Sequence, residues 1–161
     1  MKKDTRGFSL IELLIVVAII LIIAAIAIPN LLRSRIAANQ ASAVGSLRTI
    51  NTAEITYAST YNSGYSATLA NLAPPAAGSN PTATSAGLLD EVLASGNKSG
   101  YTFTYASSTA AGANTVTNYT VNANPQSVGQ TGQNYYFTDQ SAVIRQNTST
   151  QAAATDSPIG N

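Results

Sequence analysis

The chain has 161 residues, with 8 basic and 7 acidic side chains and neither cysteine nor histidine. This length predicts one small globular domain in addition to an apolar segment. The missing thiols and imidazoles exclude disulfides, thiol chemistry, and metal or catalytic sites built on Cys or His. The near-balanced charge gives no electrostatic case for tight binding to nucleic acid.

The first feature along the chain is a short basic leader followed by a long apolar run. The run extends from Gly7 to Ile28 and contains one carboxylate, that of Glu12. Its length matches the ~20 residues that a helix needs to cross a bilayer. Composition and spacing alone leave three interpretations open: a cleaved secretory signal peptide, a plain single-pass anchor, and a more specialised segment.

Residues 7–13, Gly-Phe-Ser-Leu-Ile-Glu-Leu, together with Pro29, resemble the prepilin-type cleavage and methylation motif of type IV pilins and of the related type II secretion pseudopilins. The resemblance implies that a membrane peptidase cuts after Gly7 and that the same enzyme N-methylates the new first residue, Phe8. Residues 1–7 are then a leader peptide. The strong resemblance covers the first third of the chain, and a weaker one covers the tyrosine-rich remainder.

Glu12 has a specific role in this interpretation. An isolated carboxylate inside an apolar layer is costly. The cationic amine of Phe8 in a neighbouring subunit, shifted along a filament axis, could neutralise it where the dielectric constant is low. The alternative is that Glu12 reaches the membrane surface or is protonated.

A single helix is predicted from Phe8 to about Tyr61, in two parts. Residues 8–29 form an apolar membrane or filament-core segment, and residues 30–61 form an amphipathic segment. Between them, Pro29 lacks a backbone donor, so a kink or local melting is expected near residues 25–30.

In the amphipathic segment, apolar residues recur near helical spacing and predict a stripe that covers a core. The stripe comprises Ala37, Ala41, Val44, Leu47, Ile50, Ile55, Ala58 and Tyr61. Charged residues occupy intervening positions: Arg33, Arg35, Arg48 and Glu54.

Residues 62–161 are predicted to form a globular head. Leu69 and Leu72 are expected in its core, residues 74–81 in a surface loop, and the tail from residue 146 onward in a loosely ordered polar segment in which Ile159 could dock. A short helix is predicted over residues 87–95, with Leu88, Leu89, Val92 and Leu93 facing inward. Alternating apolar and polar residues predict strands near residues 101–105, 117–123, 135–137 and 142–145. The fold class is therefore α+β, with the long helix packed against an antiparallel sheet of about four strands.

The acidic residues of the head predict no catalytic or metal site. Asp90 and Glu91 are adjacent, so they do not share a helix face, and Asp139 is expected to shape a turn. A calcium site using Asp139 or Asp156 would need several converging oxygens, and the sequence shows no such cluster. With no nucleophile–base pair either, we predict no enzyme activity, no cofactor and no metal.

The resemblance implies a structural subunit of a type IV pilus that supports adhesion or motility. Its implied partners are identical or related pilin subunits, the prepilin peptidase and methyltransferase, and an inner-membrane assembly platform. The subunit would lie in the cytoplasmic membrane, with the head outside, and then in a surface filament. Two alternatives stay open: a pseudopilin of type II secretion, and an adhesive domain that is secreted or anchored behind an ordinary signal sequence.

Overall fold

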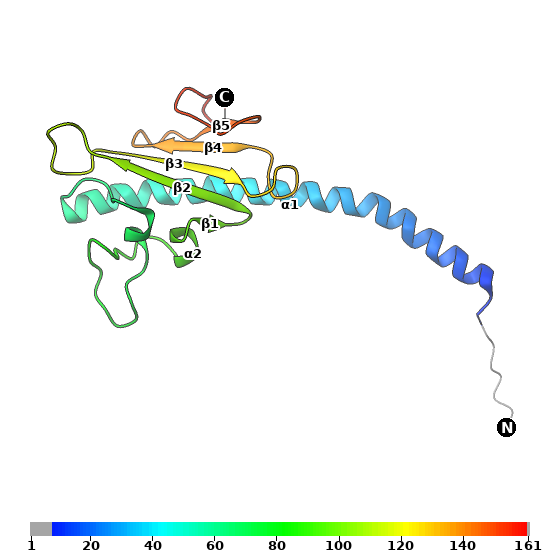
Figure 1. Ribbon diagram of the computed structural model, residues 1–161. Helices are drawn as coiled ribbons and strands as arrows, with labels where there is room; N and C mark the ends of the chain where they lie inside the picture. The colour runs from blue at the N-terminus through cyan, green and yellow to red at the C-terminus, as the bar shows by residue number, and fades with distance from the viewer. Residues whose placement is uncertain (1–7, 161) are drawn as a thin grey trace. The chain divides into compact units, whose positions relative to one another are not determined.

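The computed structural model describes residues 8–160, and the chain divides after Arg35 into two compact units. Helix α1, Leu10–Tyr61, contributes to both units (Figure 1). The leader and the cleavage residue Gly7 lie outside the described residues. The predicted subdivision at residues 7, 29 and 61 stays a prediction, although α1 ends at Tyr61, where the sequence predicted it to end.

The second unit contains the remaining elements. They are a 3-10 helix, Leu69–Leu72; α2, Glu91–Ala94; and strands β1, Asn97–Lys98, β2, Tyr101–Ser108, β3, Asn118–Pro125, β4, Tyr135–Asp139, and β5, Arg145–Asn147. The sheet is antiparallel throughout and has the order β1-β2-β3-β4-β5, so each strand pairs with its neighbours in sequence. The predicted fold class is confirmed, with five strands instead of about four.

The extra strand and the displaced last strand have simple causes. Strand β1 has only two residues, Asn97 and Lys98, too few to show an alternating pattern. The last strand was predicted over residues 142–145 but begins at Arg145. Ala142 has a φ of 59° and belongs to the turn after β4, so this residue cannot extend the ladder.

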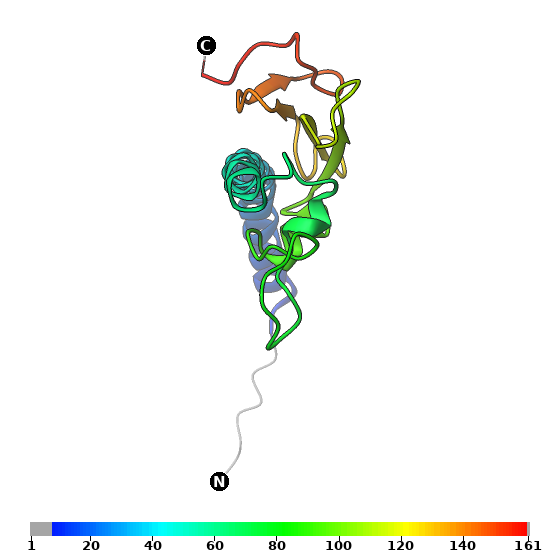
Figure 2. The same cartoon turned by 90° about the vertical axis from the view of Figure 1, so that its left-hand side faces the viewer.

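The core of the second unit lies between α1 and the sheet. Figure 2 looks along α1 and shows the sheet to one side of the helix. From β2 and β3, Tyr101, Phe103, Tyr119, Val121 and Ala123 are buried, which confirms the predicted period of two. Tyr105 stacks on Tyr119, with ring planes 7° apart and centroids separated by 6.0 Å.

The helix face that covers this core differs from the predicted stripe. Leu47 and Ile50 are fully buried as predicted, but Ile55 is 59% exposed and Glu54 is completely buried. The buried face consists of Ile36, Ala43, Ser46, Leu47, Ile50, Asn51, Ala53, Glu54 and Tyr57. The predicted stripe combined positions from two sides of the helix, since several apolar residues lie on the side turned away from the sheet.

The helix predicted over residues 87–95 is shorter than expected. Helix α2 has only four residues. The segment before it is held against the 3-10 helix, because Leu88 N and Leu89 N both donate to the carbonyl of Leu72. Leu89 and Leu93 are buried as predicted, whereas Val92 is 57% exposed. Since α2 makes barely one turn, only one side of it can contact the core.

The prediction of a loosely ordered tail is wrong for the residues described. Gln146 N donates to Ser157 O at 3.0 Å, and Ile159 N donates to Ile144 O at 2.9 Å. Ile159 packs against the core, so its docking is confirmed. Backbone pairing and burial therefore hold the segment without a disulfide.

Candidate functional site

The apolar segment of the first unit exposes its side chains on every side. Phe8 is 85% exposed, Ile20 58% and Leu31 72%, and nearly all the large hydrophobic residues between them are similarly uncovered. Among the described residues, α1 is long and apolar enough to cross a membrane by length and composition. A helix that is apolar all round is stable only when lipid or other apolar helices surround it.

Two charged positions bound the apolar part of this segment. Between Glu12 and Arg33 lie 20 residues without a charge. At 1.5 Å per residue they span about 30 Å, the thickness of the hydrocarbon core of a bilayer. The segment therefore has the length of one membrane crossing, with ionisable side chains at its two ends.

Glu12 lies in the first turn of α1 and binds the start of its own helix. Ser9 N donates to Glu12 Oε2 at 2.9 Å, and Leu13 N donates to Ser9 O at 3.2 Å. A carboxylate in this position also interacts favourably with the helix dipole. Within residues 8–160, Glu12 forms no ion pair, and its pairing with a Phe8 amine of another subunit stays a prediction.

Pro29 lies inside α1, and residues 25–30 are helical throughout. The local melting predicted there is therefore absent. Proline cannot donate the backbone bond of its turn, and a bend at Pro29 stays a prediction.

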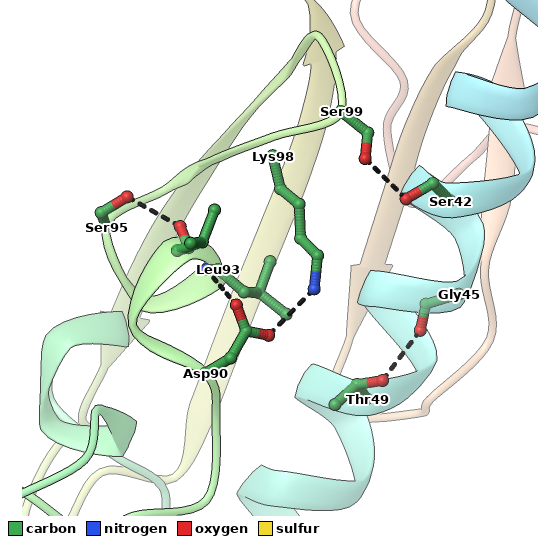
Figure 3. Close-up of polar contacts among 9 residues, drawn as sticks. Ser42, Gly45, Thr49, Asp90, Leu93, Ser95, Lys98 and Ser99 are labelled. Carbon is green, nitrogen blue, oxygen red and sulfur yellow. Dashed lines mark hydrogen bonds and ion pairs between the residues drawn. The ribbon is translucent and has the colours of Figure 1, made fainter.

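The acidic residues of the second unit serve the local backbone. Asp90 caps α2 by accepting from Leu93 N at 2.9 Å, and it pairs with Lys98 Nζ at 2.9 Å (Figure 3). The hydrogen bond from Lys98, and then that from Leu93 N, hold the pKa of Asp90 below its ordinary value. Figure 3 also shows Ser99, beside Lys98, bonded to Ser42 of α1.

The other carboxylates do not converge with Asp90. Glu91 is exposed in the first turn of α2. Asp139 accepts from Ser141 N at 2.9 Å in the turn after β4, as predicted. Asp156 accepts from Ala153 N at 2.8 Å and from Asn147 Nδ2 at 3.1 Å. In residues 8–160 no group of three His, Cys, Asp or Glu side chains could hold a metal ion.

Glu54 is the important residue that sequence reasoning placed wrongly. Its completely buried carboxylate accepts from Ser66 N at 2.9 Å and from Ser66 Oγ at 2.6 Å. The Tyr105 hydroxyl donates to Ser66 O at 2.8 Å, and its pKa is raised, chiefly by burial. The hydrogen bonds among Glu54, Ser66 and Tyr105 hold the segment after α1 against the helix. Its only sequence signal is the spacing of Glu54 from Leu47 and Ile50, which places all three on one helix face.

Comparison with known proteins identifies the N-terminal region. Residues 2–28 match the family model described as the prokaryotic N-terminal methylation motif. The chain is 53% identical over 49 residues to the type IV major pilin protein PilA of Myxococcus xanthus, a match that covers 30% of this chain and 22% of that protein. It is 62% identical over 37 residues to the type IV wide pilus major component PilA4 of Thermus thermophilus, which covers 23% and 28%, respectively.

The matched segments thus span about a quarter of the length of these two relatives. No solved structure matches the chain significantly. Both relatives are pilus components by name, and the prediction of a structural protein agrees with those names. The N-terminal part of the chain therefore carries the methylation motif and is distantly homologous to type IV major pilins.

Proposed function

We propose that the chain is the precursor of a subunit of a type IV pilus. It is cleaved after Gly7, N-methylated at Phe8 and polymerised through its apolar helix. The observation that carries this proposal is that the large apolar side chains of residues 8–32 are 40% to 85% exposed, in a segment that largely coincides with the methylation motif. Such a surface is unstable in water, since burial of apolar area is the main favourable contribution to association.

The membrane and the interior of a pilus would both surround this helix with apolar groups, so the subunit can pass from one to the other. In the cytoplasmic membrane, lipid covers residues 8–32, and the head lies outside. In a pilus on the cell surface, the same residues contact the apolar helices of identical or related subunits. Contacts that relate successive copies by a shift and a rotation do not close, so they continue as a helical filament.

Glu12 fixes the alignment of neighbouring subunits in this mechanism. Once cleavage has occurred, the methylated amine of Phe8 is a cation, and Glu12 of an adjacent copy is its anion. Leaving either charge alone in an apolar bundle is costly, whereas pairing them compensates much of this cost. Incorrect registers leave both charges unpaired. The names of the two relatives favour a pilus over a secretion pseudopilus.

The first test is the N-terminal residue and intact mass of the protein recovered from sheared surface filaments. We expect a chain that begins at N-methylated Phe8. Soluble protein that begins near Ile28, with no filaments, would contradict the proposal and indicate an ordinary secreted domain.

A second test replaces Glu12. We expect Glu12→Ala to leave membrane insertion intact and to reduce filament yield by about 100-fold or more, because each unpaired charge costs several kcal/mol. Glu91→Ala is the matched control. Because Glu91 is exposed in α2, this variant should form filaments normally. Filament yield is measured by shearing and immunoblotting. Normal filaments from Glu12→Ala would refute the pairing of charges.

A further inference from the structure

Glu12 already has a hydrogen-bond partner within its own chain. Ser9 precedes the first residue of α1, and its backbone N–H donates to Glu12 Oε2 at 2.9 Å. The sequence Ser9-Leu10-Ile11-Glu12 has the spacing of a capping box, in which a glutamate at the third helical position binds the N–H of the capping residue. Among the described residues the glutamate half of the box is formed, whereas Ser9 Oγ has no hydrogen bond to Glu12 N.

The hydrogen bond from Ser9 N to Glu12 Oε2 stabilises the start of α1 more than the same bond would stabilise a helix start in water. The first backbone N–H groups of any helix lack partners inside the helix. In water the solvent satisfies them, but at the edge of a lipid layer or inside a helical bundle there is little water to do so. Helix α2, in contrast, lies in the head and is capped by the conventional bond from Leu93 N to Asp90.

We propose that Glu12 is a positioning residue of its own helix as well as the anion of the assembly contact. Oε2 binds the Ser9 N–H and thereby fixes the first turn of α1. Oε1 accepts no hydrogen bond among the described residues, so it is available to a second donor. The first role is intramolecular and independent of assembly, and the second rests on the function proposed above.

The two roles work together because the cap orients the carboxylate. A glutamate side chain on a helix surface has three rotatable bonds, and ordering it on binding costs entropy. The Ser9 bond orders this side chain before a second subunit arrives, so less conformational entropy is lost when a donor of that subunit binds Oε1. Pre-organisation of this kind increases affinity without adding a contact.

The test measures hydrogen exchange of the residue 9 amide by NMR in the full-length chain, in detergent micelles, where no filament forms. We expect Glu12→Ala to accelerate exchange about fivefold to tenfold, as expected for the loss of one hydrogen bond. Ser9→Ala keeps the backbone N–H and should remain within about twofold of the wild type. The amide of Ile15, further along α1, is the internal reference and should not change.

Glu12→Gln separates the inference from the proposed function, because its amide oxygen can cap the helix but carries no charge. We expect its residue 9 amide to stay protected and its filament yield to fall as in Glu12→Ala. Equal exchange rates in the wild type and Glu12→Ala would overturn the capping role. Normal filaments from Glu12→Gln would overturn the charge pairing and leave the capping role intact.

Discussion

The two units of this chain share helix α1 but differ in whether their large hydrophobic side chains are buried. In residues 36–160, only three large hydrophobic side chains are exposed: Ile55, Val92 and Val128. In residues 8–32 almost every one is exposed. The second unit stabilises itself by burying apolar area between helix and sheet. The described residues of the first unit, 8–35, form no such core, and we propose that their apolar surface contacts lipid or the helices of other subunits.

The treatment of carboxylates differs in the same way. The second unit buries Glu54 completely and satisfies it with two donors from Ser66. Among residues 8–35 of the first unit the one carboxylate, that of Glu12, is exposed in the first turn of α1 and has one donor, Ser9 N. A buried carboxylate with both oxygens bonded stabilises a fold, whereas an exposed one with an open oxygen can recruit a partner.

The strongest test of this comparison substitutes the same residue type on the same helix in each unit. Leu47 is fully buried and Leu21 is 63% exposed. We expect Leu47→Ala to lower the free energy of unfolding of the head by about 3 kcal/mol, through lost burial and the cavity left behind. Leu21→Ala should leave that free energy unchanged and instead reduce filament yield.

The free energy of unfolding of both variants is measured by urea unfolding of the full chain in detergent, monitored by tyrosine fluorescence. A head destabilised equally by Leu21→Ala would mean that the apolar segment contributes to the core, and the contrast between the units would fail.

The second prediction concerns the buried carboxylate. We expect Glu54→Ala to destabilise the head by about 2 kcal/mol, because the N–H of Ser66 then lacks its acceptor in the interior. Exposed Glu91→Ala should change the unfolding free energy by less than about 0.5 kcal/mol. Thermal unfolding, monitored by near-ultraviolet circular dichroism, measures the stability of both variants. A harmless Glu54→Ala would show that the Ser66 contact is dispensable.

The smallest expected effect is a pH dependence from Asp90. Because Lys98 and Leu93 N lower its pKa in the folded state, its contribution to stability is present above the unfolded pKa of about 4 and is lost as pH falls through the folded value. The carboxylate is largely exposed, so we expect only about 0.5 kcal/mol.

Asp90→Asn is the appropriate variant, since asparagine caps helices as well as aspartate but cannot ionise. The wild type should be slightly more stable than Asp90→Asn at neutral pH, and the difference should vanish near pH 2. An unchanged difference across this range, measured by urea unfolding at each pH, would show that the Lys98 contact adds nothing.

Features set by local chemistry could be predicted from the sequence. The helix end at Tyr61 follows from the Asn-Ser-Gly sequence after it, since Asn62 and Gly64 both adopt positive φ. The alternation in residues 101–105 and 117–123 predicted two strands because a pleated strand turns successive side chains to opposite faces. The methylation motif was recognisable because it is a continuous sequence of residues at the start of the apolar run.

The sequence by itself thus determined the apolar segment, the helix, most of the strands and the family resemblance. Only the tertiary structure decided which face of α1 is buried, that Glu54 lies inside, that Val92 lies outside and that the tail is held at β5. Each of these depends on where a distant segment packs, such as Ser66 against Glu54 or Ser157 against Gln146. Burial is a property of pairs of segments, and hydrophobic patterns describe one segment at a time.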